Sequence, residues 1–133
     1  MFSLRVLRNA ADKAILHQPT LVGQIPYFSL RTVEERVFLA ALKADQVVGL
    51  ACIAEESFRT PGAIGVSYVA THSAHRKTGV AKSLVEGLFL LARERGKHIA
   101  NSFYEQDGKL WLQPLMQRAA LRYPDVHLYE HSY

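Results

Sequence analysis

The residues with the clearest potential for chemistry lie in the stretch HRKTGVAKSL, residues 75–84, where cations surround a glycine. Arg76, Lys77 and Lys82 flank Gly79, and apolar residues at helical spacing begin directly after that glycine. The first turn of a helix has free backbone N–H groups and carries the positive end of the helix dipole, so anions bind there readily. The stretch therefore predicts a phosphate-binding site, with a solvated basic loop as the alternative.

The pattern of this stretch differs from the two familiar phosphate-binding signatures. The sequence has no GxxxxGK[ST] motif, and no GxGxxG motif follows an early strand. It has Arg-x-x-Gly-x-Ala instead, in which Arg76 offers a planar guanidinium that suits phosphate. Gly79 lets a ligand approach the backbone, and Thr78 has a hydroxyl that either caps the helix or donates to an oxygen.

Strands and helices alternate on both sides of this loop. Alternating or β-branched runs predict strands, and apolar residues at a spacing of three or four predict helices. The predicted strands are residues 2–8, 36–43, 47–56, 65–71, 97–104 and 126–133. The predicted helices open at Asn9 or Asp12, run from 80 to a stop at Gly96, and run from 109 to about 122 after a turn at Asp107-Gly108.

The order of these elements sets the fold class. The second and third strands form an antiparallel hairpin through residues 44–46, while residues 20–35 have no sustained period and stay unassigned. Pro114 should distort the last helix unless it lies in its first turn. The order predicts an α/β protein in the broad sense, an α+β mixed sheet with helices packed against it.

Length and composition limit the classes of protein that fit. The chain has 133 residues, enough for one domain over residues 1–133, and its 49% hydrophobic and 21% charged residues exclude disorder. The single cysteine, Cys52, predicts a reducing, cytoplasmic compartment, and it lies in an apolar run typical of a core residue. No segment has the length of an apolar membrane span. The net charge of +4 is modest and no run of five like charges occurs, so a nucleic-acid partner is not favoured.

The loop and its neighbours resemble the GNAT superfamily, the general N-acetyltransferases that use acyl coenzyme A. Their pyrophosphate loop is [Gln/Arg]-x-x-Gly-x-[Gly/Ala], between the fourth strand and the third helix, and residues 76–81 match it in form. The element order resembles that fold over the whole chain, while the specific likeness covers residues 66–96. The resemblance implies a GNAT-like acyl-CoA N-acyltransferase fold, with a central, mostly antiparallel sheet flanked by helices.

The resemblance also implies how acetyl-CoA, the acyl donor, would be bound. Backbone amides of residues 77–82 would hold the pyrophosphate, and a backbone N–H of the preceding strand would polarise the thioester carbonyl. The strand's main chain at residues 69–71 would pair with the pantetheine arm, although Ser73 replaces the family's usual proline. No metal is expected, because His72 and His75 lack a third ligand. The predicted cofactor-binding residues are Val69, Ala70, Thr71, Arg76, Lys77, Thr78, Gly79, Val80, Ala81 and Lys82.

The catalytic residues are less clear than the cofactor site. Many family members place a tyrosine acid on the helix after the fifth strand, following an asparagine, but here that helix has neither before Tyr123. Tyr104, at the end of the preceding strand, is a substitute by position, and an ordinary strand aromatic is the alternative. Glu55 and Glu56 end the third predicted strand and are candidate bases, although a solvated strand end explains them equally well.

Three classes of function follow from these observations. The first is an N-acetyltransferase in which a primary amine attacks acetyl-CoA directly in a ternary complex. The second is an acyl-CoA-binding module without transfer, which the missing tyrosine keeps open. The third is a small basic nucleic-acid binder, although no strand alternates aromatic with cationic residues. The acceptor could be a polyamine, amino acid, antibiotic, protein lysine or N-terminus. The sequence leaves open whether the chain forms a homodimer.

Overall fold

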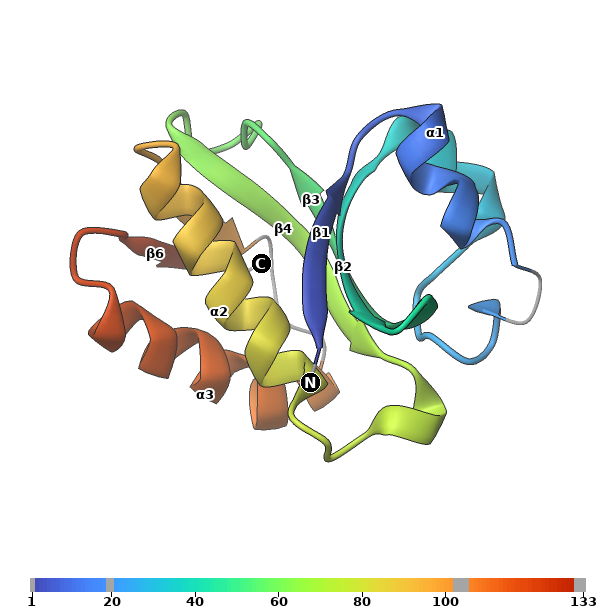
Figure 1. The fold of residues 1–133 in the computed structure, drawn as a ribbon. Coiled ribbons are helices and arrows are strands. Elements are labelled where there is room, and N and C mark those ends of the chain that lie inside the picture. The colour runs from blue at the N-terminus through green and yellow to red at the C-terminus, as the bar shows by residue number, and fades with distance from the viewer. Residues whose placement is uncertain (1, 19–20, 102–105, 131–133) are drawn as a thin grey trace.

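The computed structural model describes residues 2–18, 21–101 and 106–130, with only the backbone described at 106–109. Six strands form one sheet in the order β1-β2-β3-β4-β5-β6 (Figure 1). Neighbours from β1 to β4 are antiparallel, whereas β4, β5 and β6 are mutually parallel, which confirms the predicted mixed, mostly antiparallel sheet. The strands are β1 Ser3–Leu7, β2 Val37–Lys43, β3 Gln46–Ala54, β4 Ala63–Thr71, β5 His98–Asn101 and β6 Leu128–Glu130.

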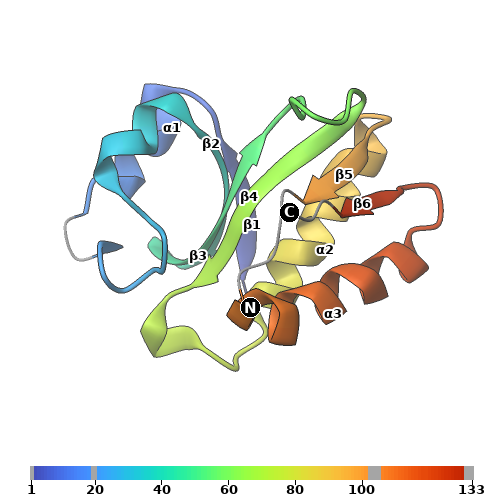
Figure 2. The ribbon, with the colours of Figure 1, turned by 180° about the vertical axis from the view of Figure 1, so that it is seen from behind.

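Helices cover both faces of this sheet (Figures 1 and 2). One face carries the short elements α1 and η1 with η3, and the other carries the long helices α2 and α3. Residues 20–35, unassigned from the sequence, contain η3 and contribute Phe28 and Val33 to the core beneath it. The helices are α1 Ala10–Lys13, η1 Ala14–Leu16, η3 Leu30–Glu35, η4 Ser73–His75, α2 Val80–Glu94 and α3 Gln106–Arg122.

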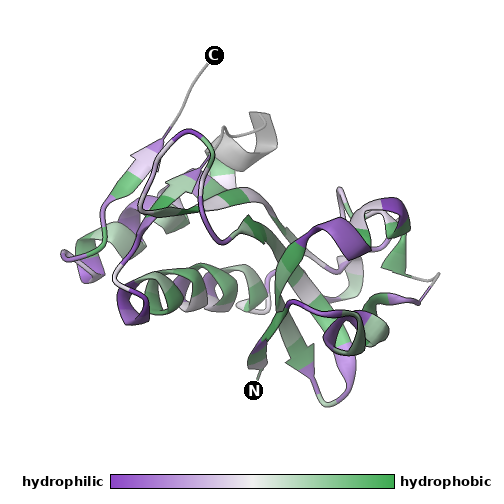
Figure 3. Cartoon of the chain, turned by 90° about the horizontal axis from the view of Figure 1, so that it is seen from above, coloured by the Kyte–Doolittle hydropathy of each residue, from purple (hydrophilic) through white to green (hydrophobic). Residues whose placement is uncertain are grey.

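The sheet separates two hydrophobic cores. In β2, Leu39 and Ala41 pack in the core under α2, whereas Phe38, Ala40 and Leu42 pack in the core under α1 and η3. This alternation follows from the two-residue period of a strand. Green, apolar segments run through the central strands in Figure 3, as expected for strands buried on both faces.

Helix α2 begins and ends where the sequence predicts. Apolar residues at helical spacing, among them Leu84, Leu88 and Phe89, are fully buried against the sheet. Gly96 follows the helix with a φ of 64°, and the N–H of Lys97 donates to the carbonyl of Ala92 at 2.8 Å. These contacts fix the axis of α2, and therefore the place of its first turn.

Strand β4 has a β-bulge near its middle and loses its parallel neighbour there. Cys52 of β3 lies opposite Tyr68 and Ile53 lies opposite Val66, so Ser67 is the extra residue. Residues 63–66 pair with β5, but no described strand lies on that side of residues 67–71. Figure 2 shows β4 and β5 side by side at one end and diverging from there.

Two predictions about the last third of the chain need correction or stay untested. The turn at Asp107-Gly108 is wrong, because α3 begins at Gln106 and runs through both residues; Pro114 therefore lies inside the helix rather than in its first turn. Tyr104 lies outside the described residues. Among the described residues, no helix combines the length and apolar character that a membrane crossing needs.

Candidate active site

The loop between β4 and α2 is fixed at its first residues. The N–H of His72 donates to the carbonyl of Val48, and that of Ser73 to the carbonyl of Gln24, both at 2.8 Å. The Thr78 hydroxyl donates to the carbonyl of His75, and the N-cap of α2 is Gly79 rather than Thr78. The loop is therefore tied to β3 and to the segment before η3.

The end of the loop adopts unusual backbone angles. Lys77 has a φ of 63°, which is uncommon for a residue with a Cβ, and Gly79 has a φ of 88°. Gly79 is the N-cap of α2, and a Cβ added there would meet no atom within 4 Å, so this glycine is required by its backbone angle and not by crowding. Strained positions such as Lys77 gather at functional sites.

The first turn of α2 presents backbone donors to solvent. The first bond within the helix runs from the N–H of Ser83 to the carbonyl of Gly79, at 3.0 Å. The N–H groups of Val80, Ala81 and Lys82 precede that bond, and no side chain caps them. The Val80 side chain is buried in the core, which holds the turn in place.

The charges around this turn are all positive. The side chains of Arg76, Lys77 and Lys82 are exposed and form no ion pair or hydrogen bond with a described residue. The first turn contains no acidic residue. Burial lowers the pKa of His72, and the neighbouring His75 lowers it further. Three cations, free amides and a helix dipole therefore act together on any anion placed here.

The strand that leads to this loop has one side available for pairing. Val69, Ala70 and Thr71 pair with β3 on one side, and no described strand lies on the other. Their side chains are buried or half-buried, so a ligand there would meet mainly backbone groups. An extended chain could pair with this edge and deliver its far end to the first turn of α2.

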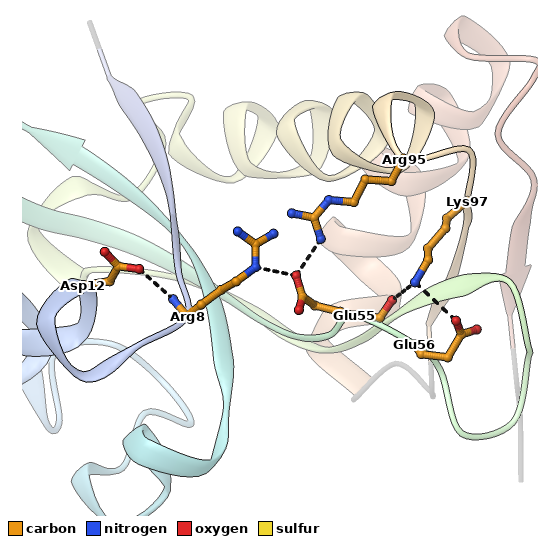
Figure 4. Close-up of polar contacts among 6 residues, drawn as sticks. All are labelled: Arg8, Asp12, Glu55, Glu56, Arg95 and Lys97. Carbon is orange, nitrogen blue, oxygen red and sulfur yellow. Dashed lines mark hydrogen bonds and ion pairs between the residues drawn. The ribbon is translucent and has the colours of Figure 1, made fainter.

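The two candidate bases lie at the opposite end of the sheet. Glu55 Oε1 accepts hydrogen bonds from Arg8 Nε at 2.6 Å and from Arg95 Nη1 at 2.5 Å (Figure 4). Glu56 accepts from the N–H of Gly62 and from Lys97 Nζ, and these bonds, the first more than the second, lower its pKa. Both carboxylates therefore hold neighbouring elements together.

The strand register gives the separation between these carboxylates and the loop. Ala54 lies opposite Gly65, whereas Gly49 lies opposite Thr71, and six residues of strand span about 20 Å. The structure does not bring Glu55 or Glu56 to the loop, and the prediction that either is the base stays a prediction. Among the described residues, no group of three or more His, Cys, Asp or Glu side chains could hold a metal.

A comparison with known protein families identifies the family of this chain. The Acetyltransferase (GNAT) family matches residues 7–109, which is most of the chain and includes β4, the loop and α2. The chain belongs to the GNAT family. The resemblance inferred from residues 76–81 is thereby confirmed.

Solved GNAT structures share the fold. A ribosomal-protein-alanine N-acetyltransferase from Brucella melitensis biovar Abortus 2308 is 21% identical, with a TM-score of 0.65 over 85% of this chain and 88% of its own. AAC(6')-Iy, solved with the bisubstrate analogue CoA-S-monomethyl-acetylneamine, is 14% identical, with a TM-score of 0.65 over 100% and 95% of the two chains. The GNAT domain of S. lividans PAT is 20% identical, with a TM-score of 0.61 over 87% and 78%. No curated protein matches the chain.

The face of this GNAT sheet opposite α2 carries residues that sequence reasoning missed. Tyr68 follows the bulge and packs half-buried against Tyr27, with ring centroids 5.8 Å apart. Burial raises the pKa of Tyr68, so its phenol is protonated and able to donate at neutral pH. The signal in the sequence was Ser67-Tyr68, two polar residues within an apolar strand, but only the register shows which face they take.

Proposed function

We propose that this GNAT protein is an N-acetyltransferase that transfers the acetyl group of acetyl-CoA to a primary amine. One observation carries the proposal. The free edge of β4 leads directly to the first turn of α2, where Arg76, Lys77 and Lys82 lack anionic partners. An extended arm ending in a pyrophosphate suits both features, because the edge offers strand-like pairing and the turn offers donors and positive charge.

Each part of the donor has a place on the chain in this proposal. The amides of residues 77–82 and the guanidinium of Arg76 bind the pyrophosphate, and Gly79 admits it to the backbone. The main chain of Val69, Ala70 and Thr71 pairs with the pantetheine arm. The thioester then lies toward the bulge at Ser67, where a backbone N–H can polarise its carbonyl.

The reaction we propose is direct attack in a ternary complex. The amine nitrogen forms a bond with the thioester carbon, the carbon–sulfur bond breaks, the amine loses a proton and the departing sulfur gains one. Alignment of the two reactants supplies much of the acceleration. Glu55 and Glu56 as the base, through water, and Tyr104 as the acid remain proposals. We also propose that residues 1–133 act as one domain and that the protein is cytoplasmic.

The proposal is tested by binding and turnover together. Acetyl-CoA should raise the melting temperature, since it binds the folded state alone. Incubation with a panel of amines should then release free CoA thiol with at least one class. A melting temperature that stays constant up to millimolar acetyl-CoA would reject the cofactor site.

A second candidate is an acyl-CoA-binding module without transfer. The observation that favours it is the absence of any tyrosine or asparagine from α3, the helix on which the family's acid is usual. Tight acetyl-CoA binding with no thiol released across the amine panel would establish this candidate in place of the enzyme.

A further inference from the structure

A group of polar side chains lies beside the bulge, on the face of the sheet that carries α1 and η3. Cys52 is opposite Tyr68 on one side and Phe38 on the other, and Arg36 lies two residues before Phe38, in extended backbone that leads directly into β2. Tyr27 packs against Tyr68 and is 58% exposed. These side chains surround the part of β4 where the proposed thioester would end.

Lys13 brings a buried positive charge to this group. Its side chain is only 3% exposed, and its Nζ donates to the backbone carbonyl of Glu34 at 3.1 Å. No carboxylate pairs with it among the described residues. An ammonium with one neutral partner is costly to bury and leaves an uncompensated positive field. That field reaches Cys52, whose thiol pKa it lowers against the larger effect of burial.

Arg36 supplies the accessible cation. Its side chain is exposed and makes no hydrogen bond or ion pair with a described residue, while its backbone N–H donates to the carbonyl of Val33. Burial raises the pKa of Cys52 and of Tyr68, and the charge of Arg36 opposes this in both cases, in keeping with its position directly before β2. Glu34 and Glu35 are adjacent in sequence, yet neither forms an ion pair with Arg36 or Lys13.

We propose that Arg36, Tyr27 and Tyr68 form the acceptor-binding surface, above the buried charge of Lys13, and that this surface selects a small amine that also bears a carboxylate, such as a free amino acid. The proposal rests on the proposed acetyl transfer. Arg36 binds the carboxylate, the two phenols donate hydrogen bonds, and the buried charge of Lys13 adds a favourable field. The amine then lies beside Ser67. A polyamine would bring further positive charge to two unpaired cations and is disfavoured.

Matched acceptors test this selection. Thiol release is measured with L-alanine and L-lysine against their amides, in which a carboxamide replaces the carboxylate, and against cadaverine, with rates compared at equal concentrations of the neutral amine. We expect kcat/KM to favour each acid over its amide by about tenfold to a hundredfold, the worth of one charge-assisted hydrogen bond. Arg36→Ala should remove that preference by raising KM for the acids alone, and Arg36→Lys should restore part of it. Arg31→Ala, at an exposed arginine of η3, is the control and should leave the preference intact.

A binding measurement separates this proposal from the proposed transfer. Calorimetry with the CoA-loaded protein compares Nα-acetyl-L-alanine and Nε-acetyl-L-lysine with their amides, and needs no turnover. Tighter binding of the acids that Arg36→Ala abolishes supports the surface even if no thiol is ever released. Equal binding of acids and amides, no binding of either, or a preference that survives Arg36→Ala would overturn it. Thiol release with cadaverine but with none of the amino acids would support acetyl transfer and would reject the proposed selection of carboxylate-bearing acceptors.

Discussion

Cations lie near both ends of α2, but they are paired with carboxylates at one end and unpaired at the other. At its C-terminal end, Arg95 bonds to Glu55 and Lys97 bonds to Glu55 and Glu56, near the negative end of the helix dipole. At its N-terminal end, three cations lie near the positive end of the dipole, and none of them forms an ion pair with a carboxylate of a described residue. The first arrangement stabilises the fold. The second disfavours it unless an anion binds.

This contrast separates the charges that hold the fold together from the charges that we propose bind the cofactor. Each cation near a helix N-terminus costs roughly 0.3–1 kcal/mol at low ionic strength, the reverse of its worth at the other end. Local rules are broken most often at functional sites, where a ligand compensates. The unpaired end is therefore the end at which changes should affect binding, and the paired end is where they should affect stability.

The largest expected effect follows from replacing Gly79 with valine. A β-branched residue does not adopt a φ of 88° without strain, so the loop and the first-turn amides must move. Acetyl-CoA binding should be lost, a loss larger than the ~1.5–3 kcal/mol of a single charge-assisted bond. Calorimetry and thermal shift measure this, with circular dichroism to show that the protein is folded.

Gly62→Val is the matched control for that change. Gly62 has a φ of 83° and, like Gly79, would place a Cβ with no atom within 4 Å, but it lies in the β3–β4 connection near Glu56. Replacement of either glycine by valine should cost ~1–2 kcal/mol of folding stability, but Gly62→Val should leave acetyl-CoA binding unchanged. Equal loss of binding in both variants would show that general strain, and not the loop, is responsible.

Arg76→Ala should have the next largest effect. It should weaken CoA binding by about 1.5–3 kcal/mol without eliminating it, because the backbone amides remain. Pantetheine without phosphate should lose much less. Arg95→Ala, at the paired end, should reduce stability and leave CoA binding unaltered. If Arg76→Ala weakens CoA and pantetheine alike, the guanidinium does not bind the anion.

Lys82→Glu should separate stability from binding in a single variant. A carboxylate in the first turn of α2 complements the dipole by about 0.3–1 kcal/mol at low salt, and repulsion from Glu86, four residues on, offsets about 0.2–0.5 kcal/mol of this, so the free energy of unfolding should rise slightly. The same charge should weaken CoA binding by repelling the pyrophosphate. Urea denaturation and calorimetry measure the two effects. A less stable variant would contradict the view that positive charge is unfavourable at this end.

The smallest effect concerns Glu56 and acid. Its pKa is depressed below 4.5 in the folded protein, so its contribution to stability is present above the unfolded pKa and is lost as pH falls through the folded pKa. Glu56→Gln should therefore be less stable than the native protein at pH 7 and should approach it in stability below about pH 4. Urea denaturation across this range measures the difference.

The variants Glu56→Gln and Glu55→Gln also test whether either carboxylate is the catalytic base. If both carboxylates serve only to hold the C-terminal end of α2 to its neighbours, the rate of thiol release per folded molecule should be unchanged in both variants. A fall of about 10²-fold or more in kcat, with an altered pH profile, would instead establish one of them as the base.

The sequence predicted the fold and the start and end of α2 well for a physical reason, while the cofactor role of the loop stays a prediction. Both depend on local pattern: the spacing of Leu84, Leu88 and Phe89, the stop at Gly96, and a glycine between cations at a helix start. The turn at Asp107-Gly108 failed because residues that often form turns were included in a longer helix, where tertiary context overrides their weak propensity.

The catalytic and acceptor residues could not be predicted in the same way. Glu55 looked available at a strand end, but its two arginine partners come from residues 47 and 40 positions away in the chain. The face that Tyr68 takes follows from the strand register and the bulge at Ser67, and Arg36 lies at the junction of η3 and β2, far away in the sequence. Such pairings depend on long-range topology, which no short pattern encodes.

The most direct test of the account is an amide titration by NMR. The backbone N–H signals of the uniformly labelled protein are followed as CoA is added. If the pyrophosphate binds at the first turn of α2, the largest chemical-shift changes should occur at the amides of Gly79, Val80, Ala81 and Lys82. The changes at Arg95 and Lys97 should be negligible. Shifts concentrated at the paired end, or none at the first turn of α2 while CoA binds, would contradict it.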